Sequence, residues 1–304
     1  MVNITHKTNS LRQAIASATI IVSKHETIEA IKNKKVPKGD VFEFSRAAGL
    51  LAIKKTSDVI PDCHPLPIEY AAINYELGEL KIIITVEIHS IYKTGVEVEA
   101  MHGAAITALT IYDMLKPLDE GVEISTIRLE TKKGGKTDFK NAQAADLRCA
   151  VIVCSDGVFY SKREDSSGKK IIEKLGQYGL TVSIHETIPD EFNLIQGKLK
   201  ELSEKDYNLI LFTGGTGLSP KDVTPDAVQP MLDREIPGIM EAARNFGQQR
   251  MPYAMLSRGV AGFIKNTLVI TLPGSPRGVE ETLDAIFPYV LHVFRVAEGL
   301  SHEL

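Results

Sequence analysis

The second half of the chain alternates short apolar runs with stretches of helical periodicity. Apolar runs with the length of buried strands occur at 149–154, 181–185, 208–213 and 268–272. Apolar residues at helical spacing follow these runs, near 167–178, 191–203, 238–249 and 277–298. This alternation predicts an α/β domain with three layers and a mostly parallel sheet.

The first half has a different pattern of apolar positions. The expected elements are a helix, two strands, a helix and a strand, at 42–55, 68–76, 80–89, 97–116 and 122–129. Gly78-Glu79 between the two strands is a hairpin signal, and Pro117 ends the second helix. This order predicts an α+β sandwich of the ferredoxin-like (split βαβ) type.

A polar segment at 132–146, without apolar periodicity, separates the two patterns. A chain of 304 residues is also long enough for two domains. We therefore expect domains at 1–140 and 148–304, joined by a linker at 141–147.

The composition excludes several classes of function. A net charge of −4 without a basic stripe argues against nucleic acid as a partner, and no run of 18 apolar residues could span a membrane. Three cysteines (Cys63, Cys149 and Cys154), without a C-x-x-C motif, favour a reducing compartment. The N-terminus lacks the apolar core of a signal peptide, so we expect a cytoplasmic protein.

A glycine-rich segment, Thr213-Gly-Gly-Thr-Gly217, directly follows one of the predicted strands. A strand followed by such a turn presents backbone N–H groups to a phosphate. Asp222 and Asp226 come next, and their carboxylates could hold Mg²⁺. The segment matches neither the P-loop nor the dinucleotide fingerprint, and a surface turn with helix caps is the alternative.

Polar turns also follow the other strands, at 155–157, 189–191 and 273–275. Ligands of open α/β sheets bind at the edge formed by the carboxyl ends of the strands. Asp190 and Asp222 would then face one site, where two carboxylates and a metal handle a polyphosphate. Taken alone, Asp190 could equally be a helix cap.

Six segments resemble the molybdopterin adenylyltransferase family over about 149–299. They are Pro189-Asp-Glu191, Thr213-Gly-Gly-Thr-Gly217, Asp222-Val-Thr-Pro-Asp226, Glu235-Ile-Pro-Gly238, Ser257-Arg258 and Leu272-Pro-Gly-Ser-Pro276. That family binds a pterin dithiolene phosphate and transfers an adenylyl group to it from Mg-ATP. The resemblance implies that Asp190 and Asp222 are catalytic and hold Mg²⁺. It implies substrate-binding roles for Thr213, Gly214, Gly215, Thr216, Gly217, Asp226, Ser257, Pro273, Gly274 and Ser275.

One segment departs from this family. The stretch 155–168 differs in length and composition from the short loop expected after the first strand. The alternative for the second half is therefore a pterin-binding or assembly module without catalytic activity.

Charged side chains in the first half could serve a triphosphate, which requires several positive charges. The candidate lysines are Lys38, Lys54, Lys93, Lys116 and Lys136. The candidate proton carriers are His64, Glu97, Glu99 and Asp113. Lys116 could instead complement a helix dipole, and Cys63-His64 alone makes no metal site.

Glu99 and Asp113 fall on one predicted helix, 14 residues apart. At about 1.5 Å per residue they are separated by roughly 21 Å, so they cannot meet one substrate atom within one subunit. If both ends of the helix are functional, a second subunit completes the site.

Five segments of the first half resemble the cyclic pyranopterin monophosphate synthase family over about 1–140. They are Lys38-Gly-Asp-Val-Phe42, Cys63-His-Pro-Leu66, Lys93-Thr-Gly-Val-Glu-Val-Glu-Ala100, Ala108-Leu-Thr-Ile-Tyr-Asp-Met114 and Gly134-Gly-Lys136. That family rearranges a cyclised GTP derivative (a cyclo-dihydroguanosine triphosphate) into cyclic pyranopterin monophosphate and releases pyrophosphate.

The resemblance assigns roles to particular residues of the first half. It implies catalytic roles for Asp113, Lys116, Lys38, His64 and Lys136. It implies substrate contacts for Asp62, Cys63, His64, Glu97, Val98 and Glu99, and Lys54 is a further substrate-binding candidate because of its charge.

Taken together, the two resemblances imply a bifunctional enzyme of molybdenum cofactor biosynthesis. ATP would be a substrate with Mg²⁺, molybdopterin and the cyclised GTP derivative would be the other substrates, and no tightly bound cofactor is expected. The two families form hexamers and trimers, which share a threefold axis. We therefore expect a homohexamer built from two trimers.

Overall fold

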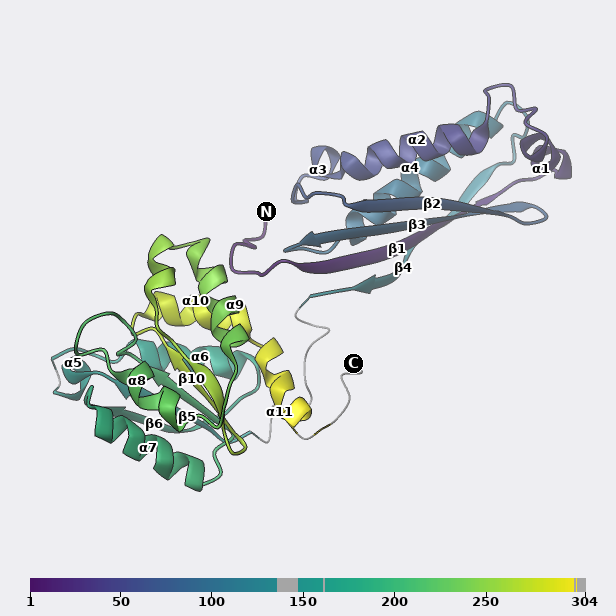
Figure 1. Cartoon of the computed structure of the whole chain (residues 1–304). Coiled ribbons are helices and arrows are strands. Elements are labelled where there is room, and N and C mark those ends of the chain that lie inside the picture. The colour runs from purple at the N-terminus through teal and green to yellow at the C-terminus, as the bar shows by residue number, and fades with distance from the viewer. Residues whose placement is uncertain (136–146, 161, 298, 300–304) are drawn as a thin grey trace. The chain divides into compact units, whose positions relative to one another are not determined.

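Figure 1 shows the computed structural model, which describes residues 1–135, 147–160, 162–297 and 299. The chain forms two compact units, Met1–Asp138 and Phe139–Leu304, and each is described by itself. Lys136 and the predicted linker at 141–147, except Leu147, lie outside the described residues.

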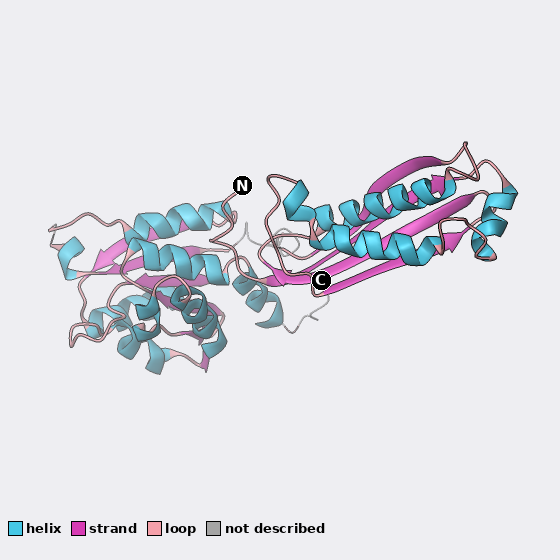
Figure 2. Cartoon of the chain, turned by 90° about the horizontal axis from the view of Figure 1, so that it is seen from above, coloured by secondary structure: helices cyan, strands magenta, loops and turns pink. Residues whose placement is uncertain are grey.

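The N-terminal unit is built on a four-stranded antiparallel sheet in the order β2-β3-β1-β4. Its strands are β1 (Ser10–Ile21), β2 (Tyr70–Leu77), β3 (Lys81–Tyr92) and β4 (Glu123–Lys133). Helices α2 (Val41–Lys54) and α4 (Glu97–Leu115) pack together and lie on one face of the sheet (Figure 2). The short helices α1 (His25–Lys32) and α3 (Thr56–Val59) complete this unit.

Two glycines bring α2 and α4 close together. A Cβ at Gly49 would lie 2.1 Å from Thr107 Oγ1, and one at Gly103 would lie 2.5 Å from Ile53 Cγ1. The small side chains let the helix backbones approach. As a result α2 packs closely against α4, the helix that carries Glu99 and Asp113.

The sequence pattern missed the interior strand β1 and the helix α1. The buried side of β1 is formed by Ala14, Ala16, Ala18 and Ile20, at most 1% exposed. Alanine is depleted in strands and favours helices, so this alternation gave a weak strand signal. The five predicted elements correspond to α2, β2, β3, α4 and β4. The ferredoxin-like assignment itself stays a prediction.

The C-terminal unit contains a six-stranded sheet in the order β6-β5-β7-β10-β9-β8. Its strands are β5 (Cys149–Cys154), β6 (Val182–Ile188), β7 (Leu209–Thr213), β8 (Arg234–Glu235), β9 (Ala261–Ile264) and β10 (Thr267–Leu272). The first four in spatial order are parallel, β9 runs antiparallel to its neighbour β10, and β8 pairs antiparallel with β9. The prediction of a mostly parallel sheet is confirmed.

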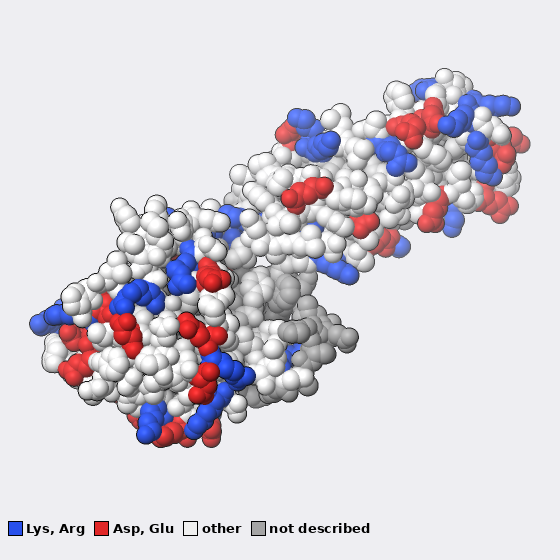
Figure 3. Space-filling model, viewed as in Figure 1, with Lys and Arg blue, Asp and Glu red and all other residues white. Residues whose placement is uncertain are grey.

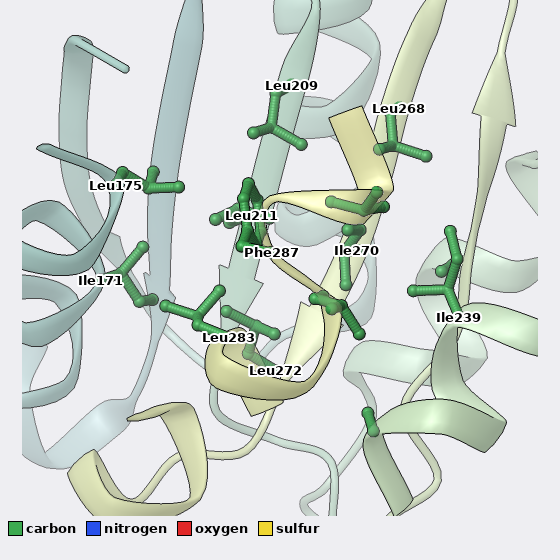
Figure 4. Packing of buried hydrophobic residues seen from close by; sticks show 14 of the residues in the cluster. Ile171, Leu175, Leu209, Leu211, Ile239, Leu268, Ile270, Leu272, Leu283 and Phe287 are labelled. Atoms are coloured by element: carbon green, nitrogen blue, oxygen red, sulfur yellow. The ribbon is translucent and has the colours of Figure 1, made fainter. Parts of the chain in front are cut away.

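Helices cover both faces of this sheet. One face carries α6 (Ser167–Gln177), α9 (Pro237–Gln248) and α10 (Pro276–Ile286); the other carries α7 (Phe192–Glu204) and α8 (Thr224–Val228). Figure 4 shows the first of these layers, in which Leu209, Leu211 and Ile270 of the sheet meet Ile171 and Leu283 of the helices.

Three details of the C-terminal unit differ from the prediction. The expected helix at 277–298 ends at Ile286 because Pro288 cannot donate a backbone hydrogen bond, and α11 (His292–Ala297) follows separately. The strand β9 was missed because only Lys265-Asn266 divides it from β10. A short helix, α5 (Asp156–Phe159), lies in the segment after β5.

Basic and acidic side chains are intermixed on the face of each unit that Figure 3 shows. Among the described residues, no helix combines the length and the apolar character needed to cross a membrane.

Candidate functional sites

The carboxyl ends of the parallel strands in the C-terminal unit border a cleft of about 650 Å³. Its lining comes from the turns after β5, β6, β7 and β10 and from the segment between α9 and β9. The predicted residues found in the lining are Asp190, Thr213, Gly214, Gly215, Thr216, Gly217, Asp222, Ser257, Pro273, Gly274 and Ser275. The fold thus brings these residues, which span nearly ninety positions of the sequence, to one place.

The glycine-rich loop can pass this edge only because it carries no side chains there. Gly214 has φ +100° and Gly215 has φ +61°, which are left-handed conformations. A Cβ at Gly214 would lie 2.1 Å from the Cys154 carbonyl oxygen, and one at Gly215 would lie 3.0 Å from Asp190 Oδ1. The loop backbone therefore runs directly beside the Asp190 carboxylate.

Asp190 is held at the edge of the cleft by backbone contacts. Its Oδ2 accepts a hydrogen bond from the Asp156 N–H at 3.3 Å, and its Oδ1 is buried without a hydrogen-bond partner in the described part of the chain. Burial raises the pKa of Asp190, and the negative charges of Asp156 and Asp222 raise it further. An ionised Asp190 would thus gain from a cation beside Oδ1.

Asp222 and Asp226 have different surroundings although both follow the glycine-rich loop. Asp222 Oδ2 accepts a hydrogen bond from the Ser219 N–H at 2.8 Å and borders Gly217. Both oxygens of Asp226 accept from Arg258 Nη1, at 2.9 Å each. Arg258 Nε also donates to the Gly217 carbonyl oxygen at 2.8 Å. Asp226 is not among the residues lining the cleft, and its contact with Arg258 fixes the loop instead.

The two cleft carboxylates suit a Mg²⁺ ion whose remaining ligands come from a bound substrate. Mg²⁺ is usually bound by one or two carboxylates together with substrate phosphates. Within the described ranges, no group of three or more His, Cys, Asp and Glu side chains could hold a metal. Asp190, with its unpartnered Oδ1, and Asp222 are the residues that would hold the ion.

Sequence reasoning assigned no site role to several residues that line this cleft. They include Ser155, Arg163, Ser166, Ser167 and Tyr253. Ser166 and Ser167 stand at the start of α6, and Ser275 caps α10 by accepting from the Gly278 N–H at 3.1 Å. Helix N-termini bind anions, and the helix starts predicted after each strand were the signal that could have identified these residues.

In the N-terminal unit, Asp113 lies between two of the predicted lysines. Its Oδ2 accepts from Lys38 Nζ at 2.7 Å, and its Oδ1 lies 2.8 Å from Lys116 Nζ. Hydrogen bonds from Lys116 and Lys38 lower the pKa of Asp113 to about 2. The carboxylate is therefore ionised at neutral pH and aligns both ammonium groups at the C-terminal end of α4.

A second cluster lies at the opposite end of α4. Glu99 is 3% exposed, and its Oε1 accepts from Cys63 Sγ at 3.2 Å. Burial raises the pKa of Glu99, while burial and the neighbouring Glu99 raise the pKa of the Cys63 thiol to about 12. His64 Nε2 lies 2.8 Å from the Val2 carbonyl oxygen, and Asp62 lies 2.7 Å from the amino terminus.

The remaining predicted residues of the N-terminal unit are more dispersed. Glu97 pairs with Lys132 at 3.4 Å, and Val98 and Lys54 are exposed. The Lys93 carbonyl oxygen accepts from the buried Arg12 at 3.3 Å. Because Glu99 and Asp113 belong to one continuous helix, a single chain keeps the two clusters apart.

A full-length relative decides the family of this chain. A molybdenum cofactor biosynthesis bifunctional protein of Chlorobaculum tepidum is 36% identical over 302 residues, which are 99% of this chain and 96% of that protein. The chain belongs to the family of bifunctional molybdenum cofactor biosynthesis proteins. Another member, from Synechococcus elongatus, is 33% identical over 315 residues and covers 99% of this chain and 98% of that protein.

The two units of this family member match two different domain families. The MoaC family matches residues 1–135, and the family described as "Probable molybdopterin binding domain" matches residues 150–292. The cyclic pyranopterin monophosphate synthase of Listeria monocytogenes is 45% identical over 145 residues, 47% of this chain and 90% of that protein. The family resemblances of both halves are confirmed.

Proposed function

We propose that this chain catalyses two steps of molybdenum cofactor biosynthesis. Its N-terminal unit converts a cyclised GTP derivative into cyclic pyranopterin monophosphate with release of pyrophosphate. Its C-terminal unit binds molybdopterin and adenylylates it with Mg-ATP. The observation that carries the proposal is the match of the whole chain to bifunctional relatives, together with the residues that line the C-terminal cleft.

The lysine cluster of the N-terminal unit suits a triphosphate substrate. Lys38 and Lys116 are already aligned by Asp113, and each can turn one N–H toward a phosphate oxygen. Their positive charge stabilises the pyrophosphate as it leaves, and such aligned charge is usually the largest catalytic contribution. At the other end of α4, burial raises the pKa of Glu99, and a carboxyl group with a raised pKa suits general acid–base catalysis.

The C-terminal cleft suits transfer of an adenylyl group. The backbone of the glycine-rich loop binds the terminal phosphate of the pterin, and Asp190 and Asp222 would hold Mg²⁺, which neutralises charge on the ATP phosphates when bound. The loop orients one oxygen of the pterin phosphate toward the α-phosphorus of ATP. A bond forms between these atoms, and the bond from the α-phosphorus to pyrophosphate breaks.

We also propose that the working form is a cytoplasmic homohexamer. A groove of about 480 Å³ beside Asp113 is lined by Lys38, Phe44, Ile106, Leu109, Thr110 and Met114. Phe44 and Leu109 are 63% and 53% exposed. Contact with a second subunit would bury this apolar surface and bring that subunit's residues close to Asp113.

A product assay with the full chain tests both activities. Incubation with the cyclised GTP derivative should yield cyclic pyranopterin monophosphate and pyrophosphate. Incubation with molybdopterin, ATP and Mg²⁺ should yield adenylylated pterin. Tight pterin binding without adenylylated product would instead assign the C-terminal unit a binding or assembly role.

A further inference from the structure

The charge of the C-terminal cleft is unfavourable for a polyphosphate. Asp190 and Asp222 contribute two carboxylates, and among the described residues of the lining Arg163 is the only lysine or arginine. Glu164 also lines the cleft, but it forms an ion pair with Lys169. Nearby charges of one sign repel a ligand of the same sign. Apart from a Mg²⁺ ion held by the two carboxylates, Arg163 is therefore the charged side chain among the described residues of the lining that can attract a nucleotide phosphate chain.

The local fold holds the Arg163 side chain in place. The backbone N–H groups of Lys162 and Arg163 both donate to the Gly157 carbonyl oxygen, at 2.9 and 3.1 Å. Arg163 Nη2 donates to Ser155 Oγ at 2.8 Å, and Ser155 is only 5% exposed. A Cβ at Gly157 would lie 2.9 Å from Arg163 Nε, so the glycine makes room for the guanidinium.

The guanidinium retains donors for a ligand. Arg163 forms no ion pair with a carboxylate in the described part of the chain. An arginine presents five N–H groups in a planar fork that matches the oxygens of a phosphate. One N–H is used on Ser155, and the others can bind a phosphate on the cleft side.

The order of the strands places the segment with Arg163 between Asp190 and the glycine-rich loop. The segment with Arg163 follows β5 and Asp190 follows β6, and these strands are neighbours. The glycine-rich loop follows β7, on the other side of β5. A phosphate chain beside Arg163 would therefore border a pterin phosphate that is bound to the loop.

We infer that Arg163 binds the phosphates of the nucleotide beyond the α-phosphate and so determines the preference for a nucleoside triphosphate. The inference rests on the proposed adenylyl transfer. In that reaction the bond from the α-phosphorus to the β-phosphate oxygen breaks, and the pyrophosphate takes the electron pair. Arg163 stabilises the charge that develops on this leaving group.

Calorimetry with the full chain in Mg²⁺ tests the inference, with ATP and AMP as probes. Arg163→Gln should weaken ATP binding about 10- to 100-fold, the range of a charge-assisted hydrogen bond. AMP binding should change less than about threefold, because AMP lacks the phosphates that Arg163 would contact. Lys162→Gln, which removes the same charge one residue away, should leave ATP affinity unchanged. Arg163→Lys should retain part of the wild-type affinity for ATP.

Several outcomes would overturn the inference. Equal losses for ATP and AMP, or an effect of Lys162→Gln as large as that of Arg163→Gln, would show that Arg163 does not bind the distal phosphates. Weaker molybdopterin binding with unchanged ATP binding would assign Arg163 to the pterin phosphate. If the wild-type chain binds no ATP, both this inference and the proposed adenylyl transfer fail, whereas ATP binding that is insensitive to Arg163→Gln removes only the inference.

Discussion

Asp156 and Asp190 each accept a hydrogen bond from the other's backbone N–H group. The Asp156 N–H lies 3.3 Å from Asp190 Oδ2, and the Asp190 N–H lies 3.2 Å from Asp156 Oδ1. This reciprocal contact joins the segments that follow β5 and β6. It uses one oxygen of Asp190 and leaves Oδ1 beside the glycine-rich loop.

The first prediction concerns the cost of keeping the Asp190 carboxylate ionised. Asp190→Asn should raise the melting temperature at pH 7 while strongly reducing adenylyl transfer. Because its pKa is raised in the folded chain, Asp190 favours folding most below its ordinary pKa of 3.8, and this contribution is lost as the pH rises through the raised value. The stability gain of the variant should therefore shrink in acid.

Thermal unfolding between pH 7 and pH 4, with and without Mg-ATP, measures this effect. Asp222→Ala is the companion variant, and it should lose adenylyl transfer but keep molybdopterin binding. A lower melting temperature for Asp190→Asn at pH 7, or a collapse of pterin affinity with an unchanged rate at saturation in Asp222→Ala, would contradict the assigned roles.

The second prediction concerns the glycine-rich loop. Gly215→Ala should destabilise the fold by about 1–2 kcal/mol, since a side chain at positive φ is strained. The new Cβ would also lie 2.4 Å from Thr224 Oγ1 and 3.0 Å from Asp190 Oδ1, so molybdopterin affinity should fall as well. Urea unfolding and pterin titration measure the two effects.

Gly197→Ala in α7 is the matched control for that substitution. Nothing beyond the neighbouring backbone of its own helix lies within 4 Å of a Cβ at this position, and alanine favours a helix interior over glycine by about 0.5–1 kcal/mol. This variant should be slightly more stable and bind pterin normally. If both variants behave alike, the loop does not require glycine at Gly215.

The sequence was most informative at the carboxyl ends of the parallel strands. Polar residues directly after apolar runs marked the cleft correctly because parallel strands must end at one edge. It was least informative where burial is achieved by small side chains, as at Ala14 and Ala16 of β1. There the strand depends on pairing with β3 and β4, which are contacts distant in sequence.

The ion pairs between side chains of the two candidate sites were only partly predictable from the sequence. Asp222 and Asp226 look equivalent in sequence, yet Arg258, 32 residues after Asp226, forms an ion pair with Asp226. Asp113 and Lys116 share a helix face and were expected to be neighbours, but the reach of Lys38 to Asp113 depends on the packing of α2 against α4. Such contacts follow from the tertiary fold rather than from local spacing.

The third prediction tests the lysine cluster. Lys116→Ala should reduce pyrophosphate release from the cyclised GTP derivative about 10²- to 10³-fold, as for loss of one aligned charge in an active site, and Asp113→Ala should abolish it. Both side chains are about half exposed, and surface ion pairs contribute little to stability, so the fold should remain intact. Pyrophosphate assays together with circular dichroism measure both outcomes, and near-normal turnover in either variant would remove the assignment.

The fourth prediction concerns assembly. Glu99 and Asp113 occupy opposite ends of α4, roughly 21 Å apart at about 1.5 Å per residue, so a site that needs both must combine residues of two subunits. Glu99→Ala and Asp113→Ala should each be inactive in the first reaction. Oligomers that contain both variants should regain part of the activity, because some interfaces then hold one intact Glu99 opposite one intact Asp113.

Mixed oligomers can be prepared by co-expression with two different affinity tags and purified over both. Light scattering should give the mass of a hexamer, and pyrophosphate release should recover to a fraction of the wild-type rate. Oligomers in which both chains carry Glu99→Ala are the matched control and should stay inactive. A monomer in light scattering, or no recovery in verified mixed oligomers, would show that each chain forms its N-terminal site alone, in which case the two clusters of α4 cannot serve the same substrate atom.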